Sequence, residues 1–160
     1  MLFDALILWI HLLSAVLFVG GSFFMWLIIV PVSHLITDNE SERTRIVGKI
    51  ARKFGNLTSP ILVVLVVTGL YNATWYVQSL TGLFEYPGTL LLSKVILVAI
   101  LLILIYVHNV YFGKRIIRLA QEGNLAGLKQ LRKRSRIVSA TTLSLMILIL
   151  LLATMMQMPP

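Results

Sequence analysis

The sequence predicts an all-α integral membrane protein, an antiparallel four-helix transmembrane bundle with both termini outside and amphipathic helices in its cytoplasmic loops. Of its 160 residues, 58% are hydrophobic and 12% charged, and the mean hydropathy is +0.92. A soluble domain of this length is less apolar. Four stretches reach the length of about 20 apolar residues that a helix needs to cross a bilayer. Two loops between them hold almost all of the positive charge.

The four predicted spans cover residues 5–33, 57–77, 89–112 and 137–156 of a single domain. The first has neither the basic start nor the cleavage site of a signal peptide, so we expect it to be retained. At 1.5 Å per residue it is about 43 Å long, so it must tilt, or bend near Pro31.

The two loops with positive charge also have helical patterns. Ile46, Ile50 and Phe54 are four residues apart, which predicts a short amphipathic helix that lies on the membrane surface or leads into the second span. In the other loop, apolar residues alternate with basic ones, which predicts helical extensions that break near Gly123 and Asn124.

The distribution of charge predicts the orientation of the bundle. Thirteen of the fourteen Lys and Arg residues lie within 34–56 and 113–136. The positive-inside rule places these loops in the cytoplasm and both termini outside, as expected for a multi-pass protein of the plasma membrane. This pattern indicates contact with the lipid bilayer and not with nucleic acid. Because the chain has no cysteine, thiolate metal sites and iron–sulfur clusters are excluded.

Three ionisable residues lie inside the predicted spans, where such groups are costly and mark functional sites. His11 and Lys94 lie at nearly the same depth, about 10 Å below the outer boundary, and His108 lies about 21 Å deeper than Lys94. His11 and His108 therefore cannot share one metal atom. His108 is instead paired by level, more loosely, with His34, Arg52 or Tyr111 near the inner face.

The sequence thus predicts an outer-level polar site built on His11 and Lys94, with Asn72 and Trp75 at the same level. Small residues follow His11 in its helix, and they permit either close helix packing or the approach of a flat ligand. Other interpretations stay open: Lys94 extends to the headgroups, and His11 is a neutral residue hydrogen-bonded to a neighbouring helix.

Three segments carry a resemblance to a known family: HLLSAVLFVGGSFF (11–24), LVVTGLYNA (65–73) and LLSKVILVAILLILIYVHN (91–109). They resemble segments of the CopD-type membrane proteins and of the related HemJ-type protoporphyrinogen oxidases, which are small four-helix proteins. The HemJ resemblance implies bound haem b and functional roles for His11 and Lys94, and His108 matches a second histidine. The fourth span lacks the Asn, Glu and Pro of the HemJ pattern, so protoporphyrinogen oxidase activity is not expected. The CopD resemblance implies copper uptake or resistance.

The first functional hypothesis is a haem b protein that transfers electrons in the membrane, with a quinone, a porphyrin or another redox protein as partner. Axial ligands and their surroundings set the potential of a haem. In this hypothesis His11 and Lys94 are catalytic, His11 and His108 are the candidate metal ligands, and His34, Arg52 and Trp75 complete the cofactor site.

The second hypothesis is a copper permease, since thioethers select Cu(I) and the C-terminal tail offers Met155, Met156 and Met158. The third is a non-catalytic subunit of a homo-oligomer or a larger membrane complex. The spans contain no pair of carboxylates, nucleophile–base arrangement or phosphate loop, so hydrolase and kinase chemistry have no support.

Overall fold

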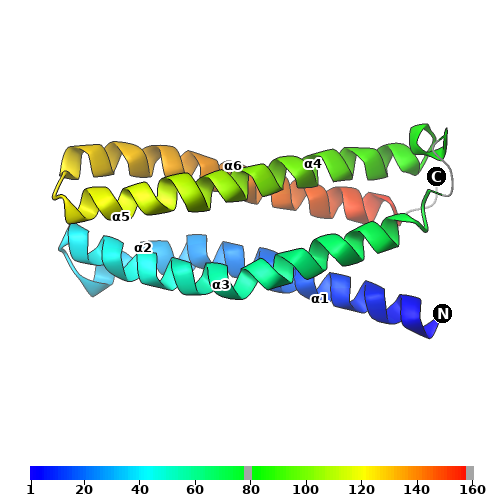
Figure 1. Ribbon diagram of the computed structural model, residues 1–160, viewed down its shortest axis with the longest axis horizontal. Coiled ribbons are helices and arrows are strands. Elements are labelled where there is room, and N and C mark those ends of the chain that lie inside the picture. The colour runs from blue at the N-terminus through cyan, green and yellow to red at the C-terminus, as the bar shows by residue number, and fades with distance from the viewer. Residues whose placement is uncertain (78–80, 158–160) are drawn as a thin grey trace.

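The computed structural model describes residues 1–77 and 81–157, and within them it forms four long helices that run side by side (Figure 1). The first consists of α1 (Leu2–Phe24), a π-helical turn η1 (Met25–Ile29) and α2 (Val30–Ile36), and the second is α3 (Glu40–Ala73). The turn η1 ends two residues before Pro31, which has no N–H to donate to the helix.

The second half of the chain forms the other two long helices. One consists of α4 (Gly88–Val107), the π-helical turn η3 (His108–Gly113) and α5 (Lys114–Gln121), and the last is α6 (Leu125–Met155). A short 3-10 helix, η2 (Thr81–Phe84), lies between α3 and α4. The described residues contain no strand, so the predicted all-α fold is confirmed.

Each of the four long helices is long and apolar enough to cross a membrane, which confirms the predicted number of spans. The helices do not begin and end where the predicted spans do, and the third and fourth cover Gly88–Gln121 and Leu125–Met155 instead of 89–112 and 137–156. The first helix extends over 2–36, and the second ends at Ala73, short of the predicted 77. In addition, residues 40–56 do not form a separate surface helix. They continue without a break into the second span, and the side chain of Asn39 caps that helix by accepting from the N–H groups of Ser41 and Glu42.

The predicted break near Gly123 and Asn124 is confirmed. Gly123 has a φ of +68°, which glycine adopts without a steric penalty. The Asn124 side chain then accepts from the Gly127 N–H at 2.9 Å and starts α6.

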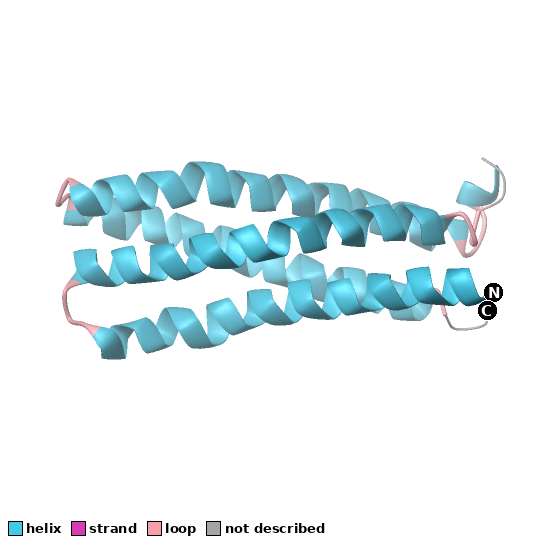
Figure 2. Ribbon diagram, turned by 60° about the horizontal axis from the view of Figure 1, so that its bottom comes forward, coloured by secondary structure: helices cyan, strands magenta, loops and turns pink. Residues whose placement is uncertain are grey.

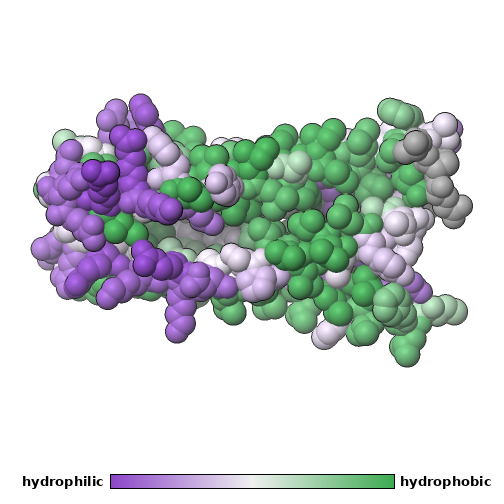
Figure 3. Space-filling view, in the orientation of Figure 1, coloured by the Kyte–Doolittle hydropathy of each residue, from purple (hydrophilic) through white to green (hydrophobic). Residues whose placement is uncertain are grey.

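The bundle has two distinct ends (Figures 1 and 2). We call the end with both termini and the α3–α4 connection the terminal end. The opposite end, with the α2–α3 and α5–α6 connections, is the basic end. Hydrophilic residues gather at the basic end, and a hydrophobic band covers most of the rest in Figure 3. Which side of a membrane each end faces stays a prediction.

The core is small because most apolar side chains point outward. Phe18, Leu101, Leu143 and Met146 form its buried centre between α1, α4 and α6. In contrast, Val16 is 67% exposed. Such outward-facing apolar surface suits lipid and not water. The chain is therefore a multi-pass membrane protein.

Candidate functional site

His11 is a residue of α1 in the terminal half of the bundle, and its imidazole contacts α3. Its Nδ1 is 3.0 Å from the carbonyl oxygen of Leu65 and 3.0 Å from the hydroxyl oxygen of Thr68. The Thr68 hydroxyl donates its own proton to the Val64 carbonyl at 2.7 Å. Both neighbours of Nδ1 therefore act as acceptors, and Nδ1 must carry the proton.

This arrangement determines the tautomer of His11. With the proton on Nδ1, the lone pair is on Nε2, and Nε2 makes no hydrogen bond to a described residue. Histidines that bind metals in proteins commonly donate the other ring N–H to a backbone carbonyl in this way. The tautomer of His11 is the one that such ligands have, and it is equally that of a neutral histidine hydrogen-bonded to a neighbouring helix, the alternative that the sequence left open.

A glycine on α3 makes room for the His11 ring. A Cβ atom at Gly69 would lie 2.9 Å from Cε1 of His11, closer than carbon atoms approach without strain. Gly21, by contrast, packs against the Phe54 ring, where a Cβ would come within 2.7 Å. Of the small residues after His11, Gly21 thus serves helix packing, whereas the opening that holds the imidazole comes from α3.

Lys94, on α4, lies near enough to His11 for its charge to act on the imidazole. Its side chain is half-buried and has neither a hydrogen bond nor an ion pair with a described residue. That the two residues form one site, and the chemical role of each, stay predictions. The site combines a neutral nitrogen donor with a cation whose charge no described carboxylate neutralises.

Asn72 is the fourth polar residue of this region, one helical turn beyond Thr68 on α3. Its side chain is 7% exposed, and neither its Nδ2 nor its Oδ1 has a hydrogen-bond partner among the described residues. A buried amide without partners costs free energy, about 1–3 kcal/mol. We call His11, Thr68, Asn72 and Lys94 the terminal-half cluster.

His108 lies apart from the terminal-half cluster. Its Nε2 is 3.1 Å from the Ser135 hydroxyl and 3.0 Å from the Ser139 hydroxyl of α6, and its ring is 6.1 Å from that of Phe112. His11 thus contacts α3, whereas His108 contacts α6.

The other predicted site residues are on the surface. His34 and Arg52 are exposed, and no described contact joins His34 to His108. Trp75 is 40% exposed and packs edge to face on Tyr71. In the tail, Met155 is exposed and Met156 is buried, and Met158 lies outside the described residues. The roles of these residues stay predictions.

Sequence reasoning missed the partners that orient the histidines. Thr68 and Gly69 hold His11, and Ser135 and Ser139 hold His108. The sequence carried a weak signal for the partners of His108, because Ser135 and Ser139 are four residues apart and therefore share one face of α6.

Comparison with known proteins gives one match. A family model described as copper resistance protein D matches residues 48–156. The matched region includes α4 with Lys94 and excludes α1 with His11. No curated protein and no solved structure matches the chain.

Proposed function

The chain belongs to the copper resistance protein D family, and from that premise we propose that it binds haem b in the terminal half of the bundle and serves membrane redox chemistry. The observation that carries the proposal is the tautomer of His11, whose Nδ1 proton is held by Leu65 and whose Nε2 lone pair is free. Such a nitrogen is a suitable axial ligand for haem iron.

The rest of the terminal-half cluster also fits this group. Haem b carries two propionates, and a cation without a carboxylate partner, such as Lys94, is suited to pair with one of them. The Asn72 amide has a free donor and a free acceptor. When bound, haem would supply a one-electron redox centre, for which a quinone or a porphyrin is the partner that we propose.

The role of each residue follows from its surroundings. Leu65 and Thr68 hold the His11 ring in one orientation and keep its proton on Nδ1. Gly69 allows α3 to approach the ring closely. Lys94 provides positive charge within the apolar part of the bundle, where Coulomb interactions are stronger than in water.

An absorption spectrum of the full-length protein, purified in detergent, tests the proposal. We expect a Soret band in the wild type and at least a tenfold weaker band, per mole of protein, in His11→Ala. The matched control is His34→Ala, which removes an exposed histidine and should leave the band unchanged. A wild type without haem, or a His11→Ala variant that keeps it, would contradict the proposal.

Copper handling is the second candidate, and the family membership favours it. His11 Nε2 could also bind copper, although the charge of Lys94 opposes the approach of a bare cation. The described residues contain no group of three His, Asp or Glu residues arranged to hold a metal ion. Metal analysis of the same purified protein separates the candidates: copper that is lost in His11→Ala, without a Soret band, would support copper handling over haem.

A further inference from the structure

A groove with a basic lining runs along the outer surface of η3 and α5 at the basic end. Its volume is about 550 Å³, and its lining consists of Val110, Tyr111, Lys114, Arg115, Arg118, Leu119 and Glu122. Along the helix these residues form two rows, in each of which neighbouring residues are four positions apart. One row extends from Val110 to Glu122 and the other from Tyr111 to Leu119, and the groove lies between the two rows. We call it the α5 groove.

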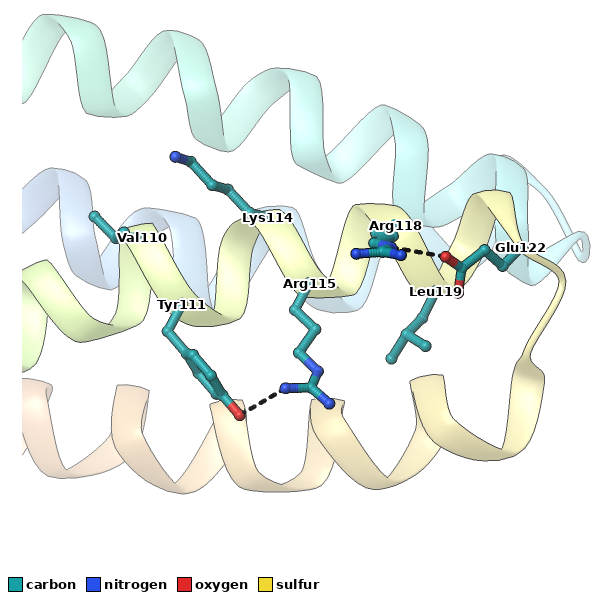
Figure 4. Close-up of a pocket in the computed structure, with 7 residues that line it drawn as sticks. All are labelled: Val110, Tyr111, Lys114, Arg115, Arg118, Leu119 and Glu122. Atoms are coloured by element: carbon teal, nitrogen blue, oxygen red, sulfur yellow. Dashed lines mark hydrogen bonds and ion pairs between the residues drawn. The ribbon is translucent and has the colours of Figure 1, made fainter.

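Two of the three cations of the α5 groove are held by contacts with other residues of its lining. Arg118 is paired with Glu122, Nε to Oε1, at 2.7 Å. Arg115 donates to the Tyr111 hydroxyl at 3.1 Å, and its guanidinium lies 5.6 Å from the centre of that ring. Figure 4 shows Tyr111 and Arg115 on one edge, and Lys114 on the other with Arg118 farther along the helix beside Glu122.

Lys114 and Arg115 are the cations of this groove that no carboxylate neutralises among the described residues. Lys114 has no described hydrogen bond, and Arg115 is held by a neutral phenol, so both keep their full charge for an anion. The Tyr111 contact also limits the freedom of the Arg115 side chain, which lowers the entropic cost of binding. Three cations against one carboxylate leave the groove net positive.

Position decides which anion fits the groove. Val110 and Leu119 contribute apolar surface to its wall, and the groove extends from Val110 in η3 to Glu122 beside the α5–α6 turn at the basic end. A phospholipid headgroup lies at this level of a bilayer, and a guanidinium and an ammonium are both suited to bind phosphate. We propose that the α5 groove binds the headgroup of an anionic phospholipid through Lys114 and Arg115, with Tyr111 as a positioning residue.

The test uses the full-length protein in a neutral detergent, titrated with phosphatidylglycerol, with the bound lipid counted by native mass spectrometry. We expect the wild type to bind phosphatidylglycerol more tightly than phosphatidylcholine. The double variant Lys114→Gln/Arg115→Gln should lose at least about tenfold in affinity. Tyr111→Phe should lose a smaller factor, because it removes only the hydroxyl that holds Arg115.

The matched control is Lys49→Gln/Lys53→Gln, which removes two exposed cations from the basic-end part of α3. It should keep the affinity of the wild type. Equal losses in the two double variants would overturn the proposal, since they would indicate attraction to overall charge. Equal binding of phosphatidylcholine, or full competition by millimolar inorganic phosphate, would overturn it as well, the latter by indicating a site for free phosphate.

Discussion

The polar groups that join the helices at the basic end are paired with one another, whereas those of the terminal-half cluster are only partly paired. At the basic end, Arg132 on α6 donates to Glu40 on α3 at 2.8 Å and also to the Thr44 hydroxyl. The Ser41 hydroxyl donates to the Ala120 carbonyl of α5 at 2.9 Å. In the terminal-half cluster, Asn72 and Lys94 have no such bonds to described residues.

The difference separates two uses of polarity in a membrane protein. Paired groups at the basic end connect α3 to α5 and α6 and stabilise the bundle. Unpaired groups inside an apolar region lower stability, and in the proposed function they are the groups that the ligand would pair with. Three substitutions test this contrast, and we take them in order of expected effect.

The largest effect is expected at the basic end. Arg132→Ala removes the bonds to Glu40 and Thr44, and we expect the free energy of unfolding to fall by about 2 kcal/mol, because hydrogen bonds to charged groups are the stronger ones. Denaturant titration in detergent measures the change. The control Arg134→Ala removes an exposed arginine of the same helix and should change stability by less than about 0.5 kcal/mol. Equal effects of the two would show that the pairing contributes nothing.

An intermediate effect is expected from Gly69→Ala. The new Cβ would lie 2.9 Å from Cε1 of His11, so the imidazole must shift, and overpacking of this kind costs about 1 kcal/mol or more. We also expect the Soret band per mole of protein to weaken several-fold. Gly55→Ala is in the same helix, and nothing lies within 4 Å of its new Cβ atom. It should preserve both the free energy of unfolding and the Soret band per mole of protein. If Gly69→Ala kept the full band, the observed position of His11 would not matter for the ligand.

The smallest effect on stability, and one of opposite sign, is expected from Asn72→Leu. Leucine has a similar volume and removes two buried polar atoms without partners, so the free energy of unfolding of the ligand-free protein should rise by about 1 kcal/mol. The variant should also bind its ligand more weakly. Asn56→Leu changes an exposed residue of the same helix and should change neither the free energy of unfolding nor ligand binding. A loss of stability in Asn72→Leu would mean that the amide stabilises the bundle.

Much of the fold could be predicted because lipid imposes simple rules on a sequence. The number of helices follows from the lengths of the apolar runs, and the break before α6 follows from Gly123 and Asn124. The end of α3 at Ala73 did not follow, and for residues 40–56 the sequence left open a surface helix or one that leads into the second span, of which the structure has the latter. Hydropathy reports which residues suit lipid, and a helix can begin or end several residues away from that boundary.

The candidate site shows a similar division. Depth along the helices predicts His11 and Lys94 at one level, because a rise of 1.5 Å per residue relates sequence position to height in a bundle. The sequence alone determined the class of protein and the number of long helices. Only the tertiary structure decided that His11 donates to Leu65, that Gly69 makes room for its ring and that Asn72 has no partner. Those contacts depend on how each helix is rotated against its neighbours, and in an apolar bundle that rotation comes from packing between helices, which no single segment encodes.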